Sequence, residues 1–168
     1  MVTQRLPAGV ERMIRDATAR GLEVHVVSRP PAGSLPEAAR LLGIQRHEII
    51  KSLVVKRKDG TFLFVLVQGD RVISWPKLRS LLGVNKLSLP QPDVALAATG
   101  YERGTITPLG SSTPWPVYAD FGVEQGRVCI GAGGRGHSAF VESAQLLAAL
   151  DATVADIGDA EPEPPAWP

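Results

Sequence analysis

The sequence predicts an α+β fold built from several short strands with helices between them. Its 168 residues, 44% hydrophobic and 21% charged, are ordinary for one globular domain with a full-sized core. Runs rich in β-branched residues are short and mixed in character. Helical patterns occur between them, but without the regular strand–helix alternation of a parallel sheet. These observations favour α+β over a regular α/β array.

The N-terminal part of the chain predicts two helices and a strand. Apolar residues recur at helical spacing over residues 8–20, and Gly21 ends this helix. Residues 23–27 alternate in the manner of a half-buried strand. A proline-rich loop then leads to a helix over 35–42, for which Ser34 is the expected N-cap.

The next segment predicts a β-hairpin. Residues 49–55 form an apolar, β-branched run that indicates a buried strand, and residues 62–67 form a second one. The pair Asp59-Gly60 between them is typical of a tight hairpin turn. The remaining elements expected are a strand over 72–74, a helix over 75–82, a strand over 86–89, a helix over 93–98 capped by Asp93, strands over 117–119, 127–130 and 138–141, a helix over 143–150, and a last strand over 154–157.

One lysine, Lys51, lies inside the apolar run 49–55. Burial costs an ammonium group much of its hydration, so such a lysine either extends to solvent or holds an anion. The strand pattern alone leaves both alternatives open.

Charge is spread unevenly along the chain. Residues 1–150 hold all 18 basic residues and 12 of the 17 acids, a balance of +6. This excess permits a nucleic-acid or phosphate ligand but falls short of the surface of a DNA-coating protein. We expect one domain over 1–157 and a mobile, Pro/Glu-rich tail over 158–168.

Cysteine usage and hydropathy indicate a cytoplasmic protein. Cys129 is the single cysteine, so no internal disulfide can form, and its apolar neighbours favour a small core residue. No apolar run approaches the roughly 20 residues of a membrane-spanning helix, and we expect neither a signal segment nor a membrane partner.

The loop 131–136 contains three glycines spaced as in the dinucleotide-binding fingerprint. That fingerprint should open a long helix, whereas residues 138–141 have strand character, so we expect the loop amides to approach another ligand. His137 directly follows the loop, and the histidines at 25, 47 and 137 lack metal-ligand spacing. The sequence shows no catalytic triad, metal site or carboxylate pair, and predicts neither a metal nor a cofactor.

Three stretches, taken in order, resemble one family. They are Glu37-Ala38-Ala39 and Leu42-Gly43 leading to Ile50-Lys51-Ser52-Leu53-Val54; Thr99-Gly100-Tyr101 followed by Gly104, Pro108 and Gly110; and the glycine loop 131–136. Together they resemble the YbaK/prolyl-tRNA-synthetase-associated (INS-like) aminoacyl-tRNA editing domains, which hydrolyse mischarged aminoacyl-tRNAs. The resemblance covers roughly residues 22–157.

This resemblance implies a mixed, partly barrel-like β-sheet flanked by helices, with a cleft for the charged 3′ end of tRNA. It makes Lys51 the essential lysine, contacting the terminal adenosine and its phosphate, and it implies water activated by backbone groups and a tRNA hydroxyl, without a metal. The residues it implies for substrate binding are Ser52, Thr99, Gly100, Tyr101, Gly104, Pro108, Gly131, Gly133, Gly136, His137 and Ser138. Because an aminoacyl ester is already activated, oriented water and amide donors can suffice.

The chain departs from the family pattern just after the glycine loop. Relatives often carry a downstream Asp where this chain has Ser138, and the lost carboxylate could change which amino acid is accepted. We predict a trans-editing deacylase for a tRNA mischarged with a small amino acid, with tRNA and an aminoacyl-tRNA synthetase as candidate partners. The alternatives are a non-catalytic module that binds tRNA 3′ ends or a synthetase, and a small-molecule hydrolase.

Overall fold

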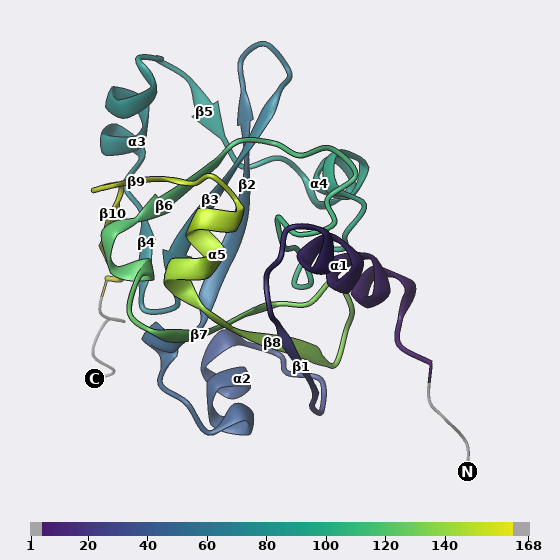
Figure 1. The fold of residues 1–168 in the computed structure, drawn as a ribbon. Helices are drawn as coiled ribbons and strands as arrows, with labels where there is room; N and C mark the ends of the chain where they lie inside the picture. Colours follow the sequence, from purple (N-terminus) through teal and green to yellow (C-terminus); the bar gives the residue numbers. More distant parts are fainter. Residues whose placement is uncertain (1–4, 163–168) are drawn as a thin grey trace.

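A long antiparallel hairpin forms the centre of the computed structural model, which describes residues 5–162 (Figure 1). Its strands are β2 (Ile50–Arg57) and β3 (Phe62–Gln68). The predicted turn joins them: the Asp59 carboxylate accepts a hydrogen bond from the Thr61 backbone N–H (2.9 Å), and Gly60 adopts φ +86°. That left-handed conformation explains why a glycine stands there.

The strands form three sheets. Five strands run in the order β5 (Leu87–Ser88), β2, β3, β6 (Val117–Asp120) and β9 (Thr153–Ala155), with parallel pairing at β3–β6 and β6–β9 and antiparallel pairing elsewhere. A second, antiparallel sheet joins β1 (His25–Ser28), β8 (His137–Glu142) and β7 (Arg127–Gly131). The third pairs β4 (Arg71–Ile73) with β10 (Gly158–Ala160). The mixed sheet is as predicted, but it is open, with β5 and β9 at its edges, and the described strands close no barrel.

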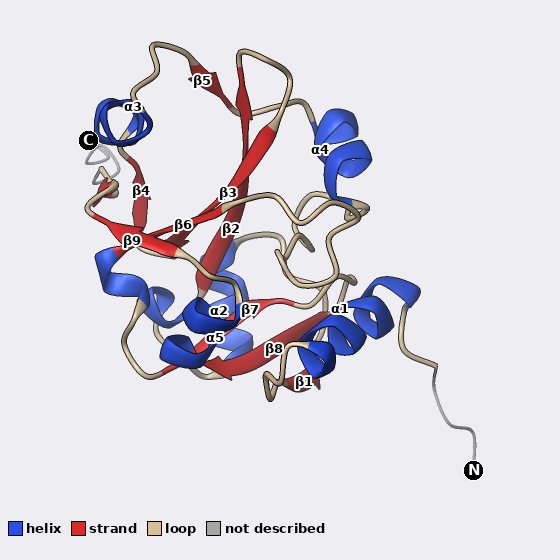
Figure 2. Ribbon diagram, turned by 45° about the horizontal axis from the view of Figure 1, so that its top comes forward, coloured by secondary structure: helices blue, strands red, loops and turns tan. Residues whose placement is uncertain are grey.

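Five helices surround these sheets: α1 (Ala8–Ala19), α2 (Leu35–Leu42), α3 (Trp75–Leu82), α4 (Pro92–Thr99) and α5 (Ser143–Ala149). Short 3₁₀ turns occupy Arg46–Glu48 and Phe121–Val123. In both ribbon views α3 lies beside β4 on one side of the molecule and α1 lies on the opposite side (Figures 1 and 2). No helix in residues 5–162 is long and apolar enough to cross a membrane.

Helix ends follow local signals with one exception. Ser34 caps α2 as predicted, because its hydroxyl oxygen accepts a hydrogen bond from the Glu37 N–H (3.2 Å). The prediction that Asp93 caps the following α4 is wrong. The helix begins one residue earlier at Pro92, with Gln91 as N-cap, because proline's fixed φ suits the first helical position.

The two faces of β2 contribute to different cores. Ile50 and Val54 pack in the larger core, which also contains apolar residues of α1 and α5. Val55 packs in the smaller core with residues of β4 and α3. Successive side chains of a strand point to opposite faces, so Ser52 lies on the side of the larger core and Lys51 on the side of the smaller one.

The C-terminal segment corrects the prediction of a mobile tail from residue 158. β10 pairs with β4, and the buried Asp120 carboxylate accepts hydrogen bonds from the backbone N–H groups of Ile157 (3.1 Å) and Gly158 (3.0 Å). Composition suggested a solvated tail because it does not reveal the partners of this segment, β4 and Asp120, which are distant in the sequence. Residues 163–168 of the predicted tail lie outside the described residues.

Candidate active site

A cavity of about 780 Å³ extends along one edge of β2. β5 pairs with β2 only at Lys56 and Arg57, which leaves residues 50–54 without β5 as a neighbour, and all five line the cavity. The other walls come from α2, the segment that joins β5 to α4, the loop after α4, and the β7–β8 hairpin. The cavity is therefore the place where the three motif-bearing parts of the chain meet.

The alternation of hydrogen-bonded pairs along β2 and β3 determines that the N–H and C=O of Ser52 point toward this cavity. The Gly69 N–H donates to the Ile49 carbonyl (2.7 Å), whereas the Phe64 N–H, opposite Val54, donates to the Pro116 carbonyl just before β6 (2.8 Å). Because hydrogen-bonded and non-hydrogen-bonded pairs alternate in an antiparallel ladder, Ser52 belongs to a non-hydrogen-bonded pair. Its N–H and C=O point away from β3, and its hydroxyl oxygen is buried with no hydrogen-bond partner among residues 5–162.

Lys51 is a half-buried cation at the border of the cavity. Its Nζ donates to the backbone carbonyl of Arg71 on β4. Burial lowers the pKa of Lys51 from its ordinary value, while the nearby carboxylates of Glu161 and Asp70 oppose this by favouring the ammonium. Of the two alternatives that the sequence left open, free extension into solvent is not what the structure shows.

The loop after α4 contributes only part of its predicted residues to the cavity. Gly104 lines it in a left-handed conformation (φ +89°), together with Arg103 and Ile106. Tyr101 instead holds the loop from inside: its hydroxyl donates to the Leu109 carbonyl (2.6 Å), and it is 1% exposed. Arg12 of α1 stacks over the Tyr101 ring, with Cζ 4.4 Å from the ring centroid.

The glycine loop 131–136 connects β7 to β8 and opens no helix, which agrees with the rejection of dinucleotide binding. Gly131 lines the cavity, and a Cβ placed on it would come within 2.6 Å of the Ile106 carbonyl oxygen. Gly133 packs elsewhere, since its Cβ would come within 2.6 Å of the Gly9 carbonyl oxygen on α1. Close approach to the Ile106 segment and to α1 therefore requires glycine at these two positions.

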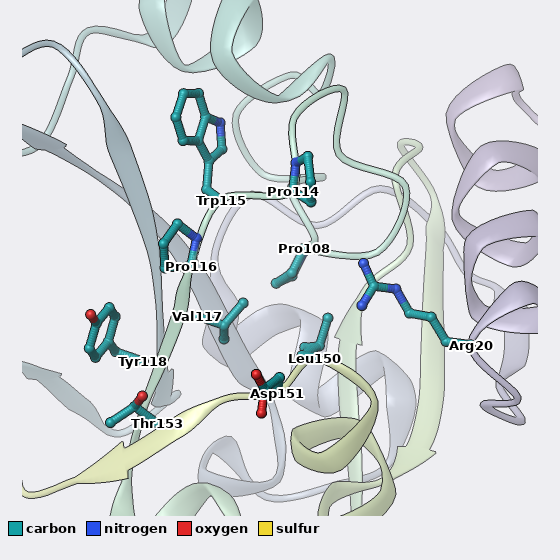
Figure 3. A pocket seen from close by; sticks show the side chains of 10 residues that line it. All are labelled: Arg20, Pro108, Pro114, Trp115, Pro116, Val117, Tyr118, Leu150, Asp151 and Thr153. Carbon is teal, nitrogen blue, oxygen red and sulfur yellow. The ribbon is translucent and has the colours of Figure 1, made fainter.

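The structure brings half of the predicted site residues together. Those that line the cavity are Lys51, Ser52, Gly104, Gly131, His137 and Ser138. Those that lie outside its lining are Thr99, Gly100, Tyr101, Gly133, Gly136 and Pro108. Thr99 is the last residue of α4, and the other five lie in the loop after α4 and in the loop 131–136. Pro108 lines a separate pocket of about 320 Å³ beside Trp115 and Arg20 (Figure 3). Spacing in the sequence could not separate residues that shape a loop from residues that face its ligand.

Arg29, like Arg103, is a cavity residue that sequence reasoning missed. It follows β1, whose antiparallel pairing places Ser28 opposite His137 of β8. Arg29 Nε consequently donates to the Ser138 hydroxyl oxygen (3.0 Å), and both residues line the cavity. No local pattern marks this arginine, because its role depends on a pairing between segments more than 100 residues apart.

The cavity offers cations, main-chain groups and few other reactive groups. Its charged lining residues, Arg29, Lys51 and Arg103, are all basic, and His137 is its single histidine. Burial raises the pKa of the Cys129 thiol to about 11, so this lining residue is a protonated thiol near neutral pH and a poor nucleophile. No group of three or more His, Cys, Asp or Glu side chains within the described range could hold a metal ion.

Comparisons with known proteins point to one family. Residues 29–149 match the family model described as an aminoacyl-tRNA editing domain. The chain is 33% identical over 98 residues to a proline–tRNA ligase of Trichlorobacter lovleyi, which covers 58% of this chain and 17% of the ligase. A solved structure described as a candidate trans-editing enzyme for prolyl-tRNA synthetase is 28% identical, with a TM-score of 0.85, and covers 93% of this chain and 100% of that one. The chain thus spans about a sixth of the curated relative and the full length of the solved structure.

Proposed function

The chain belongs to the aminoacyl-tRNA editing domain family, and on that premise we propose that it is a trans-editing deacylase, which hydrolyses the ester of a tRNA mischarged with a small amino acid. The observation that carries this proposal is the cavity at which the Lys51 strand, the Gly104 loop and the Gly131 hairpin converge. These segments are far apart in the sequence. Their meeting at one cavity is what a shared ligand requires.

In this proposal the 3′-terminal adenosine and its phosphate occupy the basic part of the cavity. Arg103 is exposed, and Lys51 is half-buried at the β2 edge. Both are suited to phosphate, Arg103 as a planar fork and Lys51 as a point charge. Lys51 acts as the cation that holds the tRNA terminus, and not as a general base, because its Nζ is engaged as a donor to the Arg71 carbonyl.

Hydrolysis then depends on positioning and on main-chain groups. An aminoacyl ester needs an oriented water and donors for the developing oxyanion. Ser52, Gly104 and Gly131 lie at the cavity wall, and the absence of a side chain at the two glycines lets main-chain amides approach the ester closely. We propose that the reaction is independent of a metal, which the donor set supports, since the lining brings one histidine and no carboxylate.

A deacylation panel tests this function. A set of tRNAs, each charged with a different amino acid, is incubated with the wild-type protein, with Lys51→Ala and with Lys56→Ala, and the remaining ester is measured. Lys56 lies on the same strand but is exposed, so it is the matched control. We expect at least one ester to be hydrolysed, a loss of roughly 100-fold or more in Lys51→Ala, and a rate close to wild type in Lys56→Ala.

The same panel separates the alternatives. Binding of charged tRNA without turnover across the panel would identify a non-catalytic module. Hydrolysis that is equally fast on a simple aminoacyl ester without tRNA would identify a small-molecule hydrolase. Equal rates for wild type and Lys51→Ala would contradict the role of Lys51. A chelator should leave the rate unchanged, and inhibition that added metal reverses would contradict metal independence.

A further inference from the structure

One of the three cations that line the cavity, Arg29, has no role in the phosphate binding proposed above. Arg103 is exposed, whereas Arg29 is half-buried and hydrogen-bonded to the cavity wall. Its Nε donates to the hydroxyl of Ser138, which is 4% exposed, and Ser138 lies beside Cys129, which is 2% exposed. The guanidinium is thus held against a buried part of the lining through Nε, while Nη1 lies nearer to solvent at the Pro30 carbonyl.

Arg29 still has donors to offer at that wall. A guanidinium carries five N–H groups. Nε is used by Ser138, and Nη1 donates to the Pro30 carbonyl (3.1 Å). Within residues 5–162 the other N–H groups of Arg29 donate to no protein acceptor, and no Asp or Glu lines the cavity to neutralise the charge. A planar fork with free donors in a partly desolvated site is suited to a carboxylate.

We propose that Arg29 is a specificity-determining residue and that the cavity accepts an aminoacyl group whose side chain carries a carboxylate, with an aspartyl ester as the smallest example. Ser138 is the positioning residue that holds the guanidinium in place. The inference rests on the proposed deacylase function and names the acyl group for that site. An amide side chain of the same shape has one acceptor oxygen and no charge, so it cannot form the bidentate ion pair, and it places an NH₂ group against the guanidinium donors.

The α-ammonium of such a substrate has a different partner. It needs acceptors, and the cavity provides main-chain carbonyls along the β2 edge, where the Ser52 C=O points away from β3. Arg29 would therefore bind the side-chain carboxylate of an acidic aminoacyl group, and the main-chain carbonyls of β2 would bind its α-ammonium. This division favours an acidic side chain over a neutral one of similar size.

The test compares two isosteric esters on one tRNA. The tRNA is charged with aspartate or with asparagine, and kcat/KM is measured for both with wild type, Arg29→Gln, Ser138→Ala and Arg15→Gln. Arg15 is an exposed arginine of α1 outside the cavity lining and is the matched control. Because a hydrogen bond to a charged group changes an equilibrium by on the order of 10- to 100-fold, wild type should prefer the aspartyl ester by that factor.

We expect Arg29→Gln to abolish the preference, mainly through a higher KM for the aspartyl ester, Ser138→Ala to reduce it, and Arg15→Gln to retain it. Equal kcat/KM for both esters in the wild-type protein would overturn the proposal without any mutant. A uniform loss for both esters in Arg29→Gln would place this arginine on the tRNA backbone and would also overturn it. Hydrolysis of neutral esters alone would refute this inference and leave the deacylase function intact, whereas failure to hydrolyse any ester would refute both.

Discussion

The Asp120 carboxylate should contribute several kcal/mol to the folded state. Its side chain is 3% exposed, and it accepts three hydrogen bonds: Oδ1 from the Ile157 and Gly158 N–H groups (3.1 and 3.0 Å), and Oδ2 from Arg71 Nε (3.0 Å). Asp120→Ala removes all three and leaves two main-chain donors without their acceptor. Hydrogen bonds to charged groups contribute about 1.5–3 kcal/mol each, but Arg71 is one-third exposed, and water replaces part of its loss.

We therefore expect Asp120→Ala to lower the free energy of unfolding by about 3–4 kcal/mol, equivalent to a drop in Tm of roughly 10 °C for a chain of this length. Urea unfolding followed by circular dichroism measures this difference. Glu124→Ala, at an exposed acid four residues away, is the control and should stay within about 0.5 kcal/mol of wild type. Amide hydrogen exchange should also accelerate at Gly158–Ala160 in Asp120→Ala. A loss below about 1 kcal/mol would refute the view that this carboxylate anchors the C-terminal strand.

Two further predictions concern titrating groups. Burial lowers the pKa of Lys51, and the protonated form holds the substrate, so the deacylation rate, corrected for spontaneous hydrolysis, should fall as pH rises through that lowered pKa. Glu161→Gln removes a carboxylate that favours the ammonium, so it should move this fall in rate to lower pH. An unchanged pH profile in Glu161→Gln would contradict the assignment. The Cys129 thiol, with its pKa of about 11, should react with iodoacetamide at pH 8 at least tenfold more slowly than free cysteine, and equal rates in the folded protein would show that the thiol is neither buried nor protonated.

Local signals determined most elements correctly. Ser34 and Gly43 bracket α2 because a hydroxyl cap and a left-handed glycine act within a few residues of each other. The Asp59-Gly60 turn fixed the central hairpin for the same reason. The start of α4 was misplaced at Asp93, where two local signals, an acidic cap and a proline at the first helical position, competed.

The candidate site was only half predictable. Lys51, Gly104 and Gly131 line the cavity as the motifs suggested. Tyr101 belongs to the same motif as Gly104, yet it is buried and bonds to Leu109 within the loop. A motif indicates that certain residues are needed at a certain spacing. It does not indicate which of them contact the ligand and which only stabilise the loop that contacts it.

The sequence by itself determined the class of fold, the order of the helices and strands as far as β9, and the lysine inside an apolar strand. Only the tertiary structure decided that β2 has an edge open to a cavity, that Lys51 bonds to the Arg71 carbonyl, and that Arg29 reaches Ser138 across the β1–β8 pairing. The physical reason is that periodicity and caps reflect contacts within a few residues. Strand pairing depends on which distant segment covers each face and edge, and a single sequence does not specify that neighbour.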